Sequence, residues 1–145
     1  ARKVVLAGFV IGVACSLVAA GMDKTTLRIA AGSGAAFLVA QLLDVSVFDR
    51  LRFRDWWQAP FLSSLVGSLV DTVLFFTIAF AAFLPPDANT GWTSEPVLLL
   101  GTGPTLPLWM SLAVADWSVK MALAVLALVP YNGLVRKILS RPVEN

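Results

Sequence analysis

The amino-acid sequence predicts an all-α integral membrane protein, a polytopic helical bundle with four transmembrane helices in a single domain over residues 1–145. Of the 145 residues, 58% are hydrophobic and only 14% are charged, whereas a soluble domain carries about 25% charged residues. A helix needs about 20 mainly apolar residues to cross the hydrocarbon core of a bilayer. Segments of this kind predict spans over approximately 4–20, 29–48, 61–84 and 106–129, followed by a basic tail over 131–145.

Prolines and short polar stretches set the expected boundaries of these spans. Pro60 and Pro130 lie next to predicted helix ends, because proline removes a helix hydrogen bond. The stretch 97–107 is partly apolar but is interrupted by two glycines and two prolines. We interpret it as a short outer-surface or re-entrant piece that leads into the last span.

The first apolar run resembles a signal peptide, since it follows a basic pair and ends in "VAA". Because further apolar runs follow it, a first transmembrane helix is the better interpretation. The chain begins with alanine, and we therefore expect it to be a fragment of a longer polypeptide.

The placement of lysine and arginine predicts the orientation in the membrane. With four spans, eight of the 11 basic residues fall on one side, two on the other and one inside a span. Cytoplasmic loops carry the excess of basic residues, so we expect both termini in the cytoplasm. The tryptophans at 56, 57, 92 and 109 lie near predicted span boundaries, where indole rings prefer to lie.

Composition excludes several kinds of functional site. The chain has no histidine, and Cys15 is its single cysteine, which excludes a disulfide framework, a Cys/His zinc site and a Ser–His or Cys–His catalytic pair. The net charge of +2 does not indicate nucleic-acid binding here, because basic residues between apolar runs set membrane orientation. We predict no catalytic residues, no metal ligands, no cofactor and no nucleic-acid partner.

Polar side chains inside the expected spans are the strongest sign of function. They are Gln41, Asp71, Asp116 and Lys120, with Asp44 nearer the cytoplasmic end of its helix. A charged group at the bilayer centre costs about 2.5–3.5 kcal/mol on insertion scales, so such groups turn inward, pair or meet a ligand. Lys120 follows Asp116 by four residues, so the two share a helix face and can form an ion pair that simply neutralises itself. Asp71 would borrow Lys120 from the neighbouring helix or be protonated.

The polar residues continue two stripes of mostly small residues. One stripe has helical spacing in the second span: Gly34, Phe37, Gln41 and Asp44. The other lies in the third span: Ser64, Gly67, Ser68 and Asp71. Small residues allow helices to approach closely, so packing alone is one interpretation. Packing does not require the carboxylate in which each stripe ends.

The segments "GSGAAFLVAQLLDVSVFDRLR", "WW" and "SSLVGSLVDTVLFFTIAF" follow a distinctive order. A helix ends in an acidic residue and a Phe-x-x-Leu-Arg turn, and a tryptophan loop leads to a serine-rich helix with Asp-Thr. This order resembles the VUT family of bacterial membrane proteins, the queuosine-precursor transporters. The resemblance implies a six-helix bundle in the bacterial inner membrane, with two spans before Ala1. The loop "WWQAPFLSS" departs from the more polar Arg-Asn stretch of the family pattern.

The resemblance further implies uptake of 7-cyano-7-deazaguanine or its aminomethyl relative. A carboxylate accepts the N–H donors of a guanine-like edge, and one bidentate contact is worth about 1–3 kcal/mol. We assign the base edge to Asp71 and Gln41, with Ser68 assisting. An aromatic ring would stack on the base, at about 1–3 kcal/mol. The candidate rings are those of Phe37, Phe75 and Trp117.

Asp116 and Lys120 are predicted to act as a switching pair, with coupling to protons left open. Asp44 completes the set of candidate substrate-binding residues. The expected partners are the deazapurine and the membrane lipids, and assembly into a homo-oligomer is left open.

Three other functions are alternatives. The chain could be the substrate-binding membrane subunit of an energy-coupled vitamin importer, which needs a separate ATPase. It could be a lipid-modifying enzyme that holds magnesium through Asp44, Asp49 and Asp55, although these residues lack tight spacing. It could also be a purely structural membrane subunit.

Overall fold

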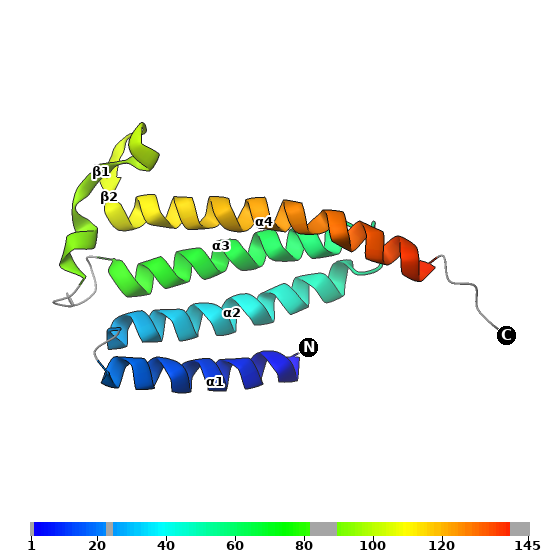
Figure 1. Cartoon of the computed structure of the whole chain (residues 1–145), viewed down its shortest axis with the longest axis horizontal. Coiled ribbons are helices and arrows are strands. Elements are labelled where there is room, and N and C mark those ends of the chain that lie inside the picture. Colours follow the sequence, from blue (N-terminus) through cyan, green and yellow to red (C-terminus); the bar gives the residue numbers. More distant parts are fainter. Residues whose placement is uncertain (1, 23–24, 82–89, 140–145) are drawn as a thin grey trace.

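The structure, a computed structural model, describes residues 2–22, 25–81 and 90–139. Its helices are α1 (Arg2–Gly21), α2 (Leu27–Leu51), α3 (Gln58–Phe80) and α4 (Leu108–Leu139). They follow one another in chain order, and successive helices run in opposite directions (Figure 1). Within the described residues, four helices are long and apolar enough to cross a membrane. The predicted helical membrane bundle is thus confirmed.

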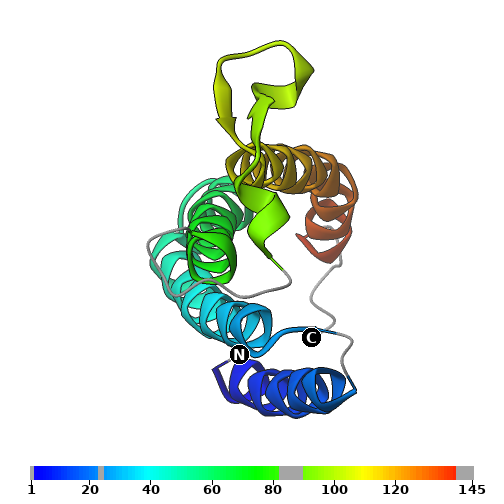
Figure 2. The same cartoon turned by 90° about the vertical axis from the view of Figure 1, so that its left-hand side faces the viewer.

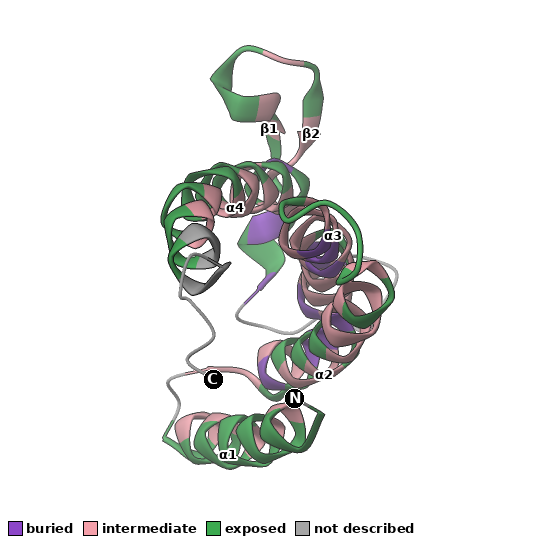
Figure 3. Cartoon of the chain, turned by 90° about the vertical axis from the view of Figure 1, so that its right-hand side faces the viewer, coloured by how far each residue is buried: buried purple, intermediate pink, exposed green. Residues whose placement is uncertain are grey.

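The helices form an open arc when they are viewed end-on, with α1 and α4 at its two ends (Figure 2). The most extensive contact joins α2 and α3, while α1 packs on α2 and α4 packs on α3. Buried residues gather on α2 and α3, whereas α1 has none (Figure 3). The α2–α3 pair is therefore the core that positions the rest.

Small residues build the contact between α2 and α3. They recur at every fourth position: Gly32, Ala36 and Ala40 are buried on α2, and Ala59, Ser63 and Gly67 on α3. In a bilayer, where lipid is as apolar as leucine, such residues favour association because they let helix backbones approach. A Cβ atom at Gly32 would lie 3.3 Å from the Phe75 carbonyl oxygen, and one at Gly67 would lie 3.2 Å from the Asp44 Cβ. Both distances are tighter than ordinary van der Waals contact, so a side chain at either position would require the neighbouring helix to shift.

Arg28 fastens the end of α3 to the beginning of α2. The helix α2 begins after Thr26, whose hydroxyl accepts a hydrogen bond from the Ile29 amide at 3.2 Å, a standard N-terminal cap. Arg28, in the first turn, donates from Nε to the Ile78 carbonyl at 2.7 Å and from Nη2 to the Ala81 carbonyl at 2.5 Å. The last carbonyls of a helix lack hydrogen-bond donors within the helix. The Arg28 guanidinium donates to two of these carbonyls at the end of α3.

At the opposite end of the bundle, Trp56 in the α2–α3 connection stacks on Tyr131 of α4, with ring centroids 6.5 Å apart. The first residues of α1 and the last part of α4 lie toward this same end (Figure 1). The α2–α3 connection, which carries Arg52 and Arg54, therefore shares a side with the beginning of α1 and the end of α4.

The segment before α4 forms a small antiparallel hairpin of β1 (Pro96–Leu98) and β2 (Thr105–Pro107). It projects sideways from the beginning of α4 (Figures 1 and 2). Leu100, in its turn, has a left-handed φ of 51°, and its amide donates a hydrogen bond to the Ser111 hydroxyl of α4 at 3.1 Å. The segment expected to be an outer-surface or re-entrant piece is thus a β-hairpin. The predicted all-α fold class did not include these two strands.

Three helix boundaries differ from the approximate predicted spans by two to four residues. The third span begins at Gln58, because Pro60 is tolerated in the first turn of a helix. That helix ends at Phe80, where Ala81 turns extended, and residues 82–84 of the prediction lie outside the described residues. The fourth span begins at Leu108, since Leu106 belongs to β2.

The predicted tail over 131–145 begins as helix. α4 continues through Pro130 to Leu139, so residues 131–139 belong to the last helix, while 140–145 lie outside the described residues. α4 changes direction in its C-terminal third (Figure 1), as helices do at an internal proline.

The close approach of α2 and α3 predicts that Gly32→Val destabilises the protein. The added side chain would meet the backbone of α3, and overpacking of this kind costs about 1–3 kcal/mol. The matched control is Gly12→Val on α1, where a Cβ atom meets nothing within 4 Å. Thermal unfolding of the detergent-solubilised variants, followed by fluorescence-detected size exclusion, measures both. Equal unfolding temperatures for the two variants would contradict the packing described.

Candidate functional site

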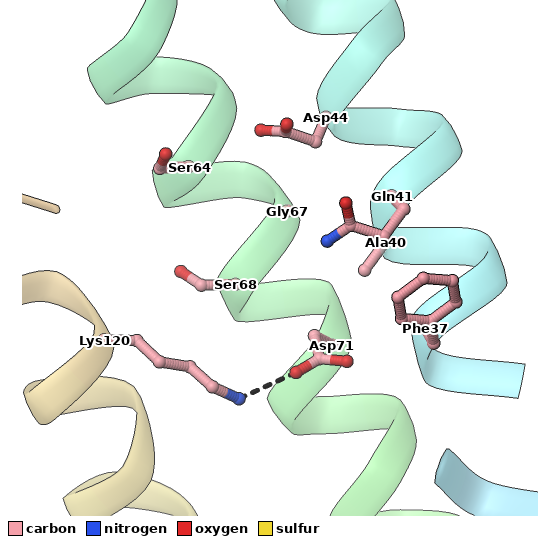
Figure 4. Close-up of a pocket in the computed structure, with 9 residues that line it drawn as sticks. All are labelled: Phe37, Ala40, Gln41, Asp44, Ser64, Gly67, Ser68, Asp71 and Lys120. Atoms are coloured by element: carbon pink, nitrogen blue, oxygen red, sulfur yellow. Dashed lines mark hydrogen bonds and ion pairs between the residues drawn. The ribbon is translucent and has the colours of Figure 1, made fainter. Parts of the chain in front are cut away.

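A pocket of about 310 Å³ lies between α2 and α3, with one residue of α4 at its edge (Figure 4). Its lining combines small, polar and charged side chains with one aromatic ring. The residues are Phe37, Ala40, Gln41 and Asp44 of α2, Ser64, Gly67, Ser68 and Asp71 of α3, and Lys120 of α4. A volume of this size is at the lower end of the range of small-molecule sites.

The two predicted polar stripes face each other across this pocket. Phe37, Gln41 and Asp44 lie on its α2 side, and the whole stripe from Ser64 to Asp71 lies on its α3 side. Gly34 alone departs, because it lines an apolar groove between α1 and α2. The antiparallel packing of α2 and α3 places the two stripes together, since both continue the small residues of the contact.

Lys120 is the centre of an intramembrane charge network. Its ammonium group lies 2.7 Å from Asp71 Oδ2 and 2.6 Å from Asp116 Oδ2. It also donates to the Thr72 hydroxyl at 3.2 Å, and that hydroxyl donates to Asp116 Oδ2 at 2.8 Å. An ammonium group has three N–H donors, and all three have acceptors here. Both predicted pairings of Lys120, within its helix and across to Asp71, are therefore present.

The network leaves one side of Asp71 open to the pocket. Lys120 binds Oδ2, and the other carboxylate oxygen lies on the side of Phe37 (Figure 4). The side chains of Asp71 and Lys120 are each about a third exposed, at 32% and 33%. A ligand in the pocket can thus reach a carboxylate that the protein already holds in place.

Gln41 and Asp44 occupy the α2 wall, and Figure 4 shows both side chains directed toward α3. In the described part of the chain, neither makes a hydrogen bond or ion pair with another side chain or with the backbone of another element. Their amide and carboxylate groups are available to a ligand. Ser68 also lines the pocket, but its hydroxyl donates to the Leu65 carbonyl at 3.3 Å.

The structure separates three predicted site residues from the pocket lining. Phe75 packs edge-to-face on Phe76 and Phe80, with centroids 5.1 and 5.9 Å away. Trp117 does not line the pocket either; its Nε1 is buried and has no hydrogen-bond partner among the described residues. Asp116 reaches the pocket only through Lys120 and Thr72.

Thr72 was given no role in the predicted site, and Phe37 was one of three candidate stacking rings. The Thr72 hydroxyl bonds to both Asp116 and Lys120. Thr72 directly follows Asp71, and adjacent residues on a helix point in different directions. That position was the signal in the sequence that Thr72 could contact a neighbouring helix. Phe37 was named only as one of three rings, yet it lies on the pocket wall, 38% exposed. Its helical spacing to Gln41 and Asp44 was the available signal, but Phe75 has the same spacing to Asp71 and does not line the pocket.

The pocket can accept N–H donors and stack a ring. Two carboxylates, one amide and two hydroxyls line it, with one phenyl ring beside them. Among the residues that the structure describes, no three acidic or cysteine side chains converge as metal ligands do. The arrangement suits a flat, polar solute rich in hydrogen-bond donors.

Comparison with known proteins assigns the family. The sequence profile described as "Putative vitamin uptake transporter" matches residues 1–135. This chain belongs to that family. Every residue of the pocket and of the Lys120 network lies in the matched range, so both are parts of the putative vitamin uptake transporter domain.

Two curated relatives support this assignment. A Haemophilus influenzae protein named "Probable queuosine precursor transporter" is 35% identical over 123 residues, which are 84% of this chain and 45% of that protein. The Escherichia coli "Queuosine precursor transporter" is 34% identical over 113 residues, 77% of this chain and 43% of that protein. The chain thus spans less than half the length of these curated relatives. No solved structure matches it significantly.

The charge network predicts that Lys120→Met lowers the amount of folded protein in the membrane. The substitution leaves the Asp71 and Asp116 carboxylates close together without a cation, and a loss of about 1–2 kcal/mol changes abundance several-fold. Removing all three charges, as Asp71→Asn, Asp116→Asn and Lys120→Met together, is expected to restore abundance. Fluorescence-detected size exclusion of solubilised membranes measures it.

Lys3→Met, at the exposed beginning of α1, is the control for loss of one positive charge. If Lys120→Met is as abundant as this control, the network contributes nothing to stability.

Proposed function

We propose that this protein carries a queuosine precursor of the deazaguanine class across the bacterial inner membrane. The supporting observation is a pocket whose Asp71 and Gln41 side chains can accept hydrogen bonds from N–H groups. It lies within helices that are apolar enough to span a bilayer. The names of two relatives point to the same cargo. The proposed activity is transport, with no chemical conversion of the cargo.

The carboxylate of Asp71 is proposed to receive the N–H donors of the guanine-like edge, and the Gln41 amide to meet the remaining polar groups. Asp71 suits this role because Lys120 fixes it at the wall and leaves one oxygen toward the pocket. Ser68 assists from α3. A contact between a carboxylate and two N–H donors is among the stronger hydrogen-bonded pairs in proteins.

We assign the stacking role to Phe37, in place of Phe75 and Trp117. Its ring belongs to the pocket wall, one helical turn from Gln41. A ring at that position can cover the face of a base whose edge meets the amide and the carboxylate, because stacking tolerates a range of offsets.

Lys120 is proposed to act as a switch with Asp116. A cargo that donates to Asp71 competes with the ammonium group for the same carboxylate. Asp116 and Thr72 already hold that ammonium from the other side, at 2.6 and 3.2 Å, so Lys120 can leave Asp71 without becoming an unpaired charge. Binding of the cargo would then break the Asp71–Lys120 contact and weaken the packing of α4 on α3. Occupation of the pocket would in this way be coupled to movement of α4 relative to α3.

The basic residues favour an orientation with both ends of the four-helix unit in the cytoplasm. Arg2 and Lys3 at the beginning of α1 and the arginines between α2 and α3 lie on one side, where the positive-inside rule places the cytoplasm. The hairpin before α4 then lies on the outer side.

Asp71→Asn is predicted to lower uptake at least about tenfold, because the substitution replaces a charged acceptor, whose hydrogen bonds are worth about 1.5–3 kcal/mol. Cells that cannot make deazaguanine would express the protein and receive the precursor at a limiting concentration. Queuosine in their tRNA is the measurement, with membrane abundance checked in parallel. Asp49→Asn, an exposed carboxylate of α2 outside the pocket, should retain uptake.

Full uptake by Asp71→Asn at normal abundance would show that the edge assignment is wrong. No uptake by the unmodified protein would show that the cargo is wrong. Transport by the purified protein in liposomes, without any ATPase subunit, would separate a self-sufficient carrier from the binding subunit of an energy-coupled importer.

The orientation predicts the behaviour of reporter fusions. A green fluorescent protein placed after α4 should fluoresce, since it folds in the cytoplasm, and alkaline phosphatase inserted in the turn of the hairpin should be active. The reverse pattern would contradict the proposed topology.

A further inference from the structure

We propose that the pocket selects a deazaguanine that carries a primary ammonium group over one that carries an uncharged nitrile, and that the Asp44 carboxylate receives the ammonium. The inference rests on the proposed function and concerns which cargo of that class is preferred. Nothing in the names of the relatives distinguishes the two compounds.

The charges around the pocket do not balance. Asp44, Asp71 and Lys120 line it, and Lys120 is shared with Asp116. The pocket and its network therefore contain three carboxylates and one ammonium group. A neutral ligand would leave this excess of negative charge inside the membrane-spanning region, where uncompensated charge is costly.

Asp44 is the carboxylate that lacks a counter-charge. Among the described residues it takes part in no ion pair and no hydrogen bond through its side chain. The next basic residue along α2 is Arg50, six positions further on and exposed, about 9 Å along the helix axis. Arg28 is at the other end of α2, bonded to α3. A cationic group on the cargo would supply the counter-charge that Asp44 lacks.

Gly67 opens the path between Asp44 and the pocket. A Cβ atom there would lie 3.2 Å from the Asp44 Cβ and 3.5 Å from its Oδ1. The absence of that atom lets the carboxylate lie over α3, and Figure 4 shows it directed that way. The position of this glycine thus serves the carboxylate as well as the helix contact.

Asp44 and Asp71 lie at opposite ends of the pocket (Figure 4). Gly67, which contacts Asp44, precedes Asp71 by four residues on α3, about 6 Å along the axis. In a 7-substituted deazaguanine, the substituent is on the five-membered ring, away from the edge that carries the N–H donors. A base whose edge meets Asp71 therefore directs its substituent toward Asp44.

The chemistry of the substituent then decides the preference. An aminomethyl group is protonated near neutral pH, as a lysine side chain is, and it donates charged hydrogen bonds to a carboxylate. A nitrile offers only an acceptor, so it would face the Asp44 oxygens without a donor between them. The same pocket should bind the first compound more tightly than the second.

The test uses radiolabelled 7-aminomethyl-7-deazaguanine and 7-cyano-7-deazaguanine, given separately at limiting concentration to cells that express the protein. Initial uptake is measured, because it does not depend on later conversion of either compound. The unmodified protein should prefer the aminomethyl compound about tenfold, the effect expected for one charged hydrogen bond. Asp44→Asn should remove most of that preference, because the uncharged amide cannot form the charged hydrogen bond. Asp49→Asn should behave like the unmodified protein.

The possible outcomes separate this inference from the proposed function. If neither compound enters, the proposed function itself fails. If both enter equally, or the cyano compound enters faster, the function stands and the charge selection is wrong. If Asp44→Asn loses both compounds equally at normal membrane abundance, Asp44 supports the pocket without selecting charge, and the inference is overturned. Membrane abundance and the size-exclusion profile of the solubilised Asp44 variant are the evidence that it is folded.

Discussion

The ammonium group of Lys120 is the contact on which the rest of the site depends. It carries a charge into the membrane-spanning region and meets three acceptors there, on α3 and on its own helix. Each of those charges would be costly in hydrocarbon alone, and together they offset much of that cost while joining α4 to α3. The same contact fixes Asp71 at the wall of the pocket. The contact that compensates the buried charges is therefore the same contact that positions Asp71 in the pocket.

Much of the site followed from the sequence because spacing on a helix is a strong constraint. Asp116 and Lys120 share a face whatever surrounds them, and the stripes ending in Asp44 and Asp71 had to face inward to avoid lipid. Thr72 and Phe37 were harder to place, because their roles depend on how far each helix is rotated against its neighbour. The sequence offered several aromatic rings, and only the packed structure separates those on the pocket wall from those in other contacts.

The errors in the fold have a similar cause. The four spans were predicted from length and hydropathy, which are local properties. The hairpin depends on pairing between Val97 and Leu106, and glycine and proline indicated only that a helix was interrupted there. Pro130 was taken as an end, yet a helix with neighbours to hold it can continue through proline with a bend. Tertiary contacts decide such cases.

The Arg28 bonds to the last carbonyls of α3 have a consequence for movement. Sliding α2 along α3 would break two charged hydrogen bonds and separate closely packed backbones, so these helices form a rigid pair. The α3–α4 joint differs, because Lys120 can exchange one acceptor for another without losing its charge partner. In the carrier proposed above, a rocking motion that exposes the pocket alternately to the two faces of the membrane would thus have its pivot between α3 and α4, with the α2–α3 pair as the fixed frame.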